Sequence, residues 1–288
     1  MRDDVREQPL TFAALDGIAF AAARGRLEMV TEKHVAAEIG PLVELFQLAR
    51  VGLLPMPLAA PWLRLDGSEA LFRAAVEGAD EWICPQDRLG AFRCKQTGAS
   101  DEKRWTSFQV RAHKAALAAG FSMQIVRRLL GAMGEIRDNL IEHSEAASTG
   151  LVVFRSRPGS FEFAVADNGI GTLASLRTNV QYAGLRDEGE ALQCALTDGE
   201  SRFGKAAGRG TGFSQLFKSL AFLNASLRFR SGDHALSIEG KSPTLLSALV
   251  AKKPRSSGFL ASVFCRSTDA LPRHQTNVAL SSLSRRKR

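Results

Sequence analysis

Three polar residues, Glu135, Asn139 and His143, recur at every fourth position. The apolar residues around them recur at three- and four-residue steps, which predicts a helix over 123–143 with this polar stripe on one face. A carboxamide oxygen can ligate Mg²⁺, and a carboxylate can orient or deprotonate a water molecule. The stripe therefore suits metal–phosphate chemistry, although a solvated helix face has the same pattern.

An aspartate follows two strand-like runs, 151–157 and 161–166, that are joined by Arg-Pro-Gly-Ser and so predict a hairpin. Asp167 ends the second run, and glycines follow at 169 and 171. A carboxylate at a strand end, beside glycines that admit close backbone approach, can accept a hydrogen bond from an adenine amino group. A plain Asp-Asn-Gly turn is the alternative.

Glycines alternate at 208, 210 and 212, and helical apolar spacing follows over 213–223. Backbone N–H groups at such a helix start can hold phosphate oxygens. The string is not a P-loop, because it lacks a Gly-Lys-Ser/Thr ending. It is not a dinucleotide fingerprint either, because the glycines do not directly follow a strand. A flexible linker has a similar composition.

Together, Glu-x-x-x-Asn on a helix, Asp-x-Gly-x-Gly at a strand end and Gly-x-Gly-x-Gly before a helix resemble the three nucleotide-binding boxes of the GHKL ATPases. This superfamily includes gyrase, the heat-shock chaperone ATPases, histidine kinases and MutL. The resemblance covers residues 120–268. It implies a Bergerat-type, two-layer α/β sandwich that holds ATP between its helices and its sheet.

The resemblance also implies roles for individual residues. Asn139 would coordinate a Mg²⁺ ion that bridges the ATP phosphates, and Glu135 would be the general base for the attacking water. Asp167 would bind the adenine amino group, with Gly169 and Gly171 giving it room. Many histidine kinases of the superfamily carry Asn in place of the base-like Glu, so Glu135 is more similar to the hydrolases and the anti-sigma serine kinases.

The third box would form the phosphate-side wall, from Gly208, Gly210, Thr211 and Gly212. Lys205 and Arg209 lie where a cation could reach phosphate, and either could equally be solvated. Residues 172–207 would be the ATP lid, ordered only around the nucleotide. One departure is that Phe259 follows Gly258, where the family often has Thr near the adenine.

By resemblance, the chain is a GHKL-type Mg²⁺–ATP-binding protein that hydrolyses ATP or transfers its γ-phosphate to a partner protein in cytoplasmic signalling. Two alternatives stay open: a non-catalytic, nucleotide-gated interaction module, and an atypical histidine kinase that uses His113. The family's acceptor histidine normally precedes an acidic residue, whereas Lys114 follows His113. A surface or packing role for His113 is therefore favoured.

With 288 residues, 45% of them hydrophobic, the chain can bury one or two ordinary cores. We expect an α+β protein with three parts. Residues 1–104 would form an α-rich accessory domain for sensing or docking, residues 105–268 the ATP-binding domain, and residues 269–288 a basic, disordered tail. The polar run 97–104 is the predicted linker.

Apolar periodicity predicts the remaining elements. They are a helix over 31–52 that is kinked or divided at Gly40-Pro41, a helix over 69–78, a short helix over 108–119, a hairpin of 227–230 and 235–239, a helix over 244–251 and a closing strand over 259–265. We expect the strands to form a mixed sheet with helices packed on one face.

Charge and composition constrain partners and location. Residues 251–288 hold nine Lys or Arg and one Asp, and so account for the whole net charge of +8. As partners we expect a regulatory protein, a second copy in a homodimer, and nucleic acid only through this tail. Without a signal-like start or a long apolar run, we expect a cytoplasmic protein that does not engage a membrane. The four cysteines lack C-x-x-C spacing, so zinc is not expected.

Overall fold

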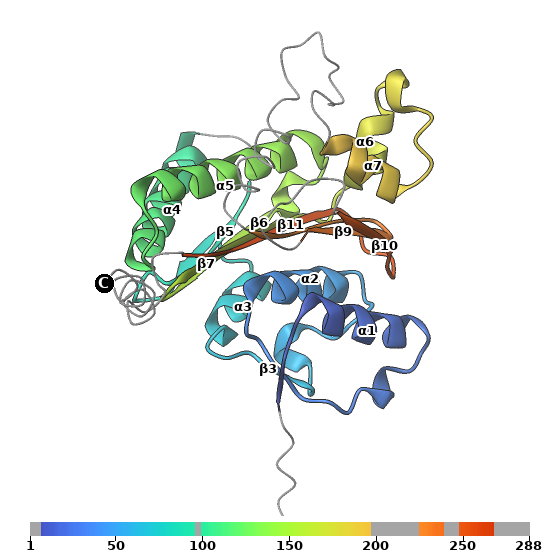
Figure 1. The fold of residues 1–288 in the computed structure, drawn as a ribbon, viewed down its shortest axis with the longest axis horizontal. Helices are drawn as coiled ribbons and strands as arrows, with labels where there is room; N and C mark the ends of the chain where they lie inside the picture. Colours follow the sequence, from blue (N-terminus) through green and yellow to red (C-terminus); the bar gives the residue numbers. More distant parts are fainter. Residues whose placement is uncertain (1–6, 96–98, 197–224, 239–247, 268–288) are drawn as a thin grey trace, which may run out of the picture.

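One antiparallel sheet of eight strands runs through the computed structural model (Figure 1), which describes residues 7–95, 99–196, 225–238 and 248–267. The strand order is β10-β9-β8-β11-β7-β6-β5-β4. The strands are β4 (Glu81–Ile83), β5 (Leu89–Arg93), β6 (Leu151–Arg157), β7 (Ser160–Ala166), β8 (Ser226–Ser231), β9 (His234–Ile238), β10 (Leu249–Lys252) and β11 (Phe259–Arg266). The protein is therefore α+β, as predicted.

The expectation of a mixed sheet is wrong, because every adjacent pair of strands is antiparallel. Tight hairpins join β6 to β7 and β8 to β9. The last strand, β11, lies between β7 and β8 and opposes both. The hairpins predicted over 151–166 and 227–239 and the closing strand over 259–265 are confirmed, with residue 239 outside the described part.

Both faces of the sheet are buried. Along β6, Val152 and Phe154 belong to the hydrophobic core on one face, whereas Leu151 and Val153 belong to the core on the other. Because neighbouring strand residues point to opposite faces, an unbroken apolar run such as Leu-Val-Val-Phe is typical of a strand covered on both sides. The described chain therefore forms three layers, whereas a two-layer sandwich was expected of residues 105–268.

Helices α4 (Ala99–Ala118) and α5 (Met123–His143) cover the first face (Figure 1). The bounds of α5 match the predicted helix. Helix α4 is longer than predicted, because it begins inside the polar run that was expected to be a linker. Trp105, Phe108 and Ala112 give α4 an apolar stripe that packs in the core, so the helix continues through its polar first turns.

The other face is covered by α1 (Phe12–Ala23), α2 (Ile39–Arg50) and α3 (Glu69–Val76) (Figure 1). A small parallel sheet accompanies them, formed by β1 (Gln8–Pro9), β2 (His34–Val35) and β3 (Leu63–Arg64). Its core is shared with the large sheet, since Leu42 and Phe72 belong to the same cluster as Ala164 and Leu260. The segment that was predicted to be an accessory domain thus forms a layer of the fold and also supplies β4 and β5. The short 3₁₀ helices of the chain are η1 (Leu27–Met29), η2 (Pro57–Ala59), η3 (Ala147–Thr149) and η4 (Val180–Tyr182).

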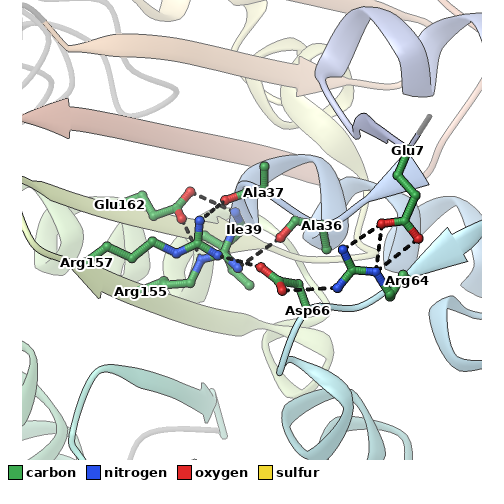
Figure 2. Close-up of polar contacts among 9 residues, drawn as sticks. All are labelled: Glu7, Ala36, Ala37, Ile39, Arg64, Asp66, Arg155, Arg157 and Glu162. Atoms are coloured by element: carbon green, nitrogen blue, oxygen red, sulfur yellow. Dashed lines mark hydrogen bonds and ion pairs between the residues drawn. The ribbon is translucent and has the colours of Figure 1, made fainter. Parts of the chain in front are cut away.

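Hydrogen bonds and the ion pair of Arg157 with Asp66 join this N-terminal layer to the sheet (Figure 2). Glu162 of β7 accepts a hydrogen bond from the Ile39 N–H at 2.7 Å, at the start of α2, and pairs with Arg155 Nε at 2.7 Å. Arg157 Nη1 donates to the Ala37 carbonyl oxygen at 3.0 Å. A carboxylate at a helix N-terminus is favoured by the free N–H groups and the helix dipole. These contacts fix the start of α2 on β7.

The helix predicted over 31–52 differs in the structure, where residues 34–35 form β2 and α2 begins at Ile39. Gly40 and Pro41 lie in its first turn and do not kink it. Proline is tolerated there because its missing N–H has no partner within the helix anyway. A side chain at Gly40 would overlap Ser262 of β11, so glycine allows α2 to lie close against the sheet.

Two further expectations differ from the structure. Residues 249–252 are β10, paired with β9, although a helix was predicted over 244–251, whose first four residues lie outside the described part. Residues 172–196, predicted to order only around a nucleotide, form α6 (Gly171–Arg177), η4 and α7 (Glu188–Ala195). Leu176, Tyr182 and Ala191 make a small core there, and Leu192 joins the main core. Residues 197–207 lie outside the described part.

None of the described helices is long and apolar enough to cross a membrane. The basic tail predicted for residues 269–288 lies outside the part of the chain that the structure describes.

Candidate functional site

A buried carboxylate stands at the end of β7. The Asp167 side chain is 2% exposed, and its Oδ1 accepts a hydrogen bond from the Gly169 N–H at 2.7 Å. Burial raises the pKa of Asp167 to about 6, against the opposing effect of backbone hydrogen bonds from Gly169 and Phe259. Among the described residues, its hydrogen-bond partners are backbone N–H groups, and no cationic side chain pairs with it. A buried acid without a cationic partner is unusual in a structural role.

The glycines of this loop allow neighbouring segments of the backbone to pack closely against one another. A side chain at Gly169 would overlap the Ser144 carbonyl oxygen, just past the end of α5. Gly171 has φ +80 and Gly258 has φ +72, a region that disfavours other residues. A side chain at Gly258 would also overlap the Asp167 carbonyl oxygen. Packing within the chain is therefore enough to explain why glycine occupies these positions, and no bound ligand is needed to explain it.

Helix α5 brings the predicted catalytic stripe to the same end of the sheet. Ser122 caps its start, and Ile136 and Leu140 face the core. Glu135 is exposed and Asn139 is half-buried, so the stripe lies on the outer side of the helix. Asn139 is five residues before the C-cap Ser144, about 7.5 Å along the helix axis.

The end of α5 is joined directly to the Asp167 loop. The Ile170 N–H donates to the Ser144 carbonyl oxygen at 3.0 Å, and the Asn168 N–H donates to Thr149 Oγ1 at 2.9 Å. The first predicted box, on α5, and the second, in the Asp167 loop, therefore meet at one end of the sheet. The third box, comprising Gly208, Gly210, Thr211 and Gly212, lies outside the described residues, as do Lys205 and Arg209.

The start of α6 follows this loop, and its N–H groups are bonded to protein. The Thr172 N–H donates to Ser231 Oγ at 2.8 Å, and the Leu173 N–H donates to Glu188 Oε2 at 3.0 Å. These donors are therefore engaged within the described structure and are not available to a phosphate there.

Arg137 determines how α5 is rotated about its own axis. The sequence analysis did not identify this residue. Its side chain is buried, and Nη2 bonds Glu102 Oε1 at 2.9 Å and lies 3.6 Å from Asp101 Oδ2. The guanidinium also lies over the Trp105 ring, 4.9 Å from its centre. Because Arg137 points into the α4–α5 interface, Glu135 and Asn139 on either side of it in the sequence are turned outward.

Gln47 of α2 is the second residue that sequence analysis did not identify. It is 3% exposed, and its Nε2 donates to the Asp167 carbonyl oxygen at 2.6 Å and to the Phe259 carbonyl oxygen at 2.9 Å. The available signal was an uncharged polar residue in a strongly apolar stretch, which indicates a buried hydrogen bond but not its partner.

The described residues contain no group of three or more His, Cys, Asp or Glu side chains placed to hold a metal ion, and the four cysteines are free. Burial raises the pKa of the Cys94 thiol to about 12, so it is unreactive. His113 is half-buried on α4. No protein-family model matches this chain, and no curated protein matches it either.

Proposed function

We propose that the chain binds Mg²⁺–ATP where the end of α5 meets the loop after β7, as a GHKL-type protein. The observation that carries the proposal is the buried carboxylate of Asp167, which has no cationic partner among the described residues and is bonded through its loop to the helix that carries Glu135 and Asn139. Helices α4 to α7 and the large sheet would then be the Bergerat-type two-layer sandwich, with α1 to α3 as an added third layer.

Asp167 is suited to recognise an adenine amino group. When ionised, a carboxylate only accepts hydrogen bonds, and Gly169 occupies one of its oxygens. A carboxylate can accept about four hydrogen bonds, so acceptor sites remain beyond the backbone bonds from Gly169 and Phe259 for a donor such as the N6 amino group. Guanine has a carbonyl oxygen at the matching ring position, so an acceptor would face an acceptor. The site should therefore prefer adenine nucleotides to guanine nucleotides.

Asn139 and Glu135 lie on the outer side of α5, one turn apart. In the proposed complex Asn139 contributes a carboxamide oxygen to Mg²⁺, which prefers oxygen ligands and takes others from phosphate and water. The ion supplies neutralisation of phosphate charge. Glu135 orients a water molecule or the hydroxyl of a partner protein and accepts its proton. An exposed base of this kind favours phosphate chemistry over a purely nucleotide-gated module.

Calorimetric titration of the full chain with ATP, ADP and GTP, with and without Mg²⁺, tests the binding. ATP and ADP should bind, and GTP should bind more weakly. No binding of ATP by the wild-type chain would refute the proposal.

Single-turnover incubation with γ-labelled ATP and cell extract then separates free phosphate, labelled protein and unreacted nucleotide. Glu135→Ala should keep ATP affinity and slow loss of the γ-phosphate by roughly 10²–10⁴-fold, the usual contribution of a general base. Asp138→Asn, at an exposed position of the same helix, is the control: it removes a carboxylate charge but keeps an oxygen for Arg137 Nη1, so it should leave the rate nearly unchanged. Wild-type turnover in Glu135→Ala would remove the base role from Glu135.

A further inference from the structure

Helix α2 presents a polar stripe to the sheet. Its residues from Ile39 to Leu48 are all buried. Gly40, Glu44 and Gln47 recur at four- and three-residue steps, so they lie on one face of the helix. Each contacts the large sheet: Gly40 lies against β11, Glu44 pairs with arginines of β8, and Gln47 reaches the ends of β7 and β11.

Gln47 connects two adjacent strand ends with one amide group. Phe259 starts β11, and its carbonyl oxygen accepts hydrogen bonds from the Asp167 N–H at 2.9 Å and from Gln47 Nε2 at 2.9 Å. The same Nε2 bonds the Asp167 carbonyl oxygen at 2.6 Å. The backbone of Asp167 is therefore held from both sides, by the neighbouring strand and by α2.

Glu44 holds the third strand end. It is fully buried, with Oε2 2.7 Å from Arg228 Nε and Oε1 bonded to Arg230 Nη1. Arg230 precedes Ser231, which stands opposite Phe259 in the sheet and accepts the Thr172 N–H at the start of α6. Helix α2 thus contacts all three strand ends beneath the loop that carries Asp167.

We infer that Gln47 is a positioning residue for the adenine side of the site, so that the N-terminal layer controls nucleotide affinity. This inference rests on the proposed function. Gln47 is coupled closely to the carboxylate, because the carbonyl that it bonds and the proposed adenine acceptor belong to the same residue, Asp167. The backbone of Gly258 also packs tightly against that carbonyl oxygen, which limits its movement. Without Gln47, the buried Asp167 carbonyl oxygen would lose this donor, while the Phe259 carbonyl oxygen would keep its bond from the Asp167 N–H. A buried carbonyl without a donor is destabilised, so we expect the end of β7 to shift.

Titration calorimetry on the full-length Gln47→Met variant tests this role. Met has a similar length but no donor. The ATP dissociation constant should rise roughly tenfold, as expected for loss of a buried hydrogen bond to a binding element. The preference for ATP over GTP should fall with it, while the fraction of binding-competent chains stays at the wild-type value.

Arg157→Gln is the matched control, because Arg157 anchors the same layer at the opposite end of α2 through the Ala37 carbonyl oxygen. It should leave ATP affinity and the ATP-to-GTP preference unchanged. If Arg157→Gln weakens binding as much as Gln47→Met, the effect comes from loosening the whole layer and the positioning role is refuted.

The remaining outcomes separate this inference from the proposed function. Wild-type affinity and nucleotide preference in Gln47→Met, or a lower fraction of competent chains with unchanged affinity, would overturn the role of Gln47 while ATP binding stands. Absence of ATP binding by the wild-type chain would refute the proposed function instead.

If Gln47→Met does not fold, Gln47→Asn is tested in its place, because its amide is one methylene too short to reach both carbonyls. Weakened ATP binding then supports the role, and wild-type affinity overturns it.

Discussion

In the proposed site, Asp167 is the residue on which nucleotide binding would depend most directly, and its burial is costly to the fold. A carboxylate that loses water without gaining a cation is destabilised, which is why its pKa rises to about 6 from an ordinary value of 3.8. Proteins tolerate such groups mainly where function requires them. The cost can therefore be measured independently of any ligand.

The sign of this effect follows from proton binding. The folded state binds the Asp167 proton more tightly than the unfolded state, so stability falls as the pH rises from about 3.8 to about 6. Asp167→Asn removes the charge and keeps an oxygen for the Gly169 N–H. At pH 7.5 it should raise the free energy of unfolding by about 1–3 kcal/mol, and this gain should vanish below pH ~4. Urea unfolding across this pH range measures it.

The same substitution should abolish or badly weaken ATP binding in calorimetric titration, because an amide presents a donor as well as an acceptor to the adenine edge. A variant that is more stable and inactive would identify Asp167 as a functional residue. Unchanged ATP affinity would instead remove the adenine role from Asp167, and a loss of stability at pH 7.5 would contradict the account of its burial.

At the scale of elements, helices α5 and α2 approach the Asp167 loop from opposite faces of the sheet. Helix α5 carries the candidate chemistry and is oriented by Arg137 in the α4–α5 interface. Helix α2 carries no candidate chemistry, yet its buried polar stripe contacts the strand ends beneath the loop. The position of the site is therefore determined by a helix that contributes no side chain to it.

The stability of the contact between α2 and β8 depends on pH through the buried Glu44. Burial alone would raise the pKa of Glu44, but the charges of Arg228 and Arg230 lower it to about 2, against an ordinary value of 4.5. The ionised Glu44 thus contributes to the free energy of unfolding above pH 4.5, and this contribution is lost as the pH falls towards 2. Glu44→Gln leaves the buried Arg230 without its carboxylate partner and leaves Arg228 with Asp16 alone, and should cost about 3–5 kcal/mol at pH 7.

Chemical denaturation of wild type and Glu44→Gln between pH 7 and pH 3 measures this difference, which should shrink as the pH falls below 4.5. Glu7→Gln provides the control, because Glu7 forms an exposed ion pair with Arg64 and its loss should change stability little. A Glu44→Gln variant as stable as wild type at pH 7 would show that the buried pairs contribute no net stability.

At the scale of the whole molecule, the N-terminal layer and the large sheet share one hydrophobic core. Leu42 and Phe72 pack in the same cluster as Val153, Ala164 and Leu260 of the sheet. Separating the two layers would expose these side chains to water. We therefore expect residues 7–76 to unfold together with the sheet, as one cooperative unit.

Thermal unfolding followed by far-ultraviolet circular dichroism and by scanning calorimetry should give a single transition, with equal calorimetric and van't Hoff enthalpies. ATP should raise the midpoint of that one transition, because a ligand that binds only the folded state stabilises everything that unfolds with it. Two transitions, of which ATP shifts only one, would contradict the shared core and would favour an independently folded accessory domain.

The sequence alone determined the elements whose signals are local. The apolar period of α5, with Glu135 and Asn139 on its outer side, follows from residues within a few turns of each other. The hairpin of β6 and β7 follows from Arg-Pro-Gly-Ser between two apolar runs, and it places Asp167 at a strand end. Both predictions are confirmed, because short-range geometry decides them.

Tertiary structure alone decided what lies on the second face of the sheet and what holds the Asp167 loop. The hydrogen bond from Gln47 to Asp167 joins residues 120 positions apart, and the pair of Glu44 with Arg228 joins residues 184 positions apart. Nothing in either residue's own neighbourhood encodes its partner. The unbroken apolar run of β6 is typical of a strand buried on both faces, yet helices were expected on one face only, and nothing in the run shows that residues 7–76 provide the second cover. Local periodicity selects helices and strands, whereas only packing of the whole chain selects which of them meet.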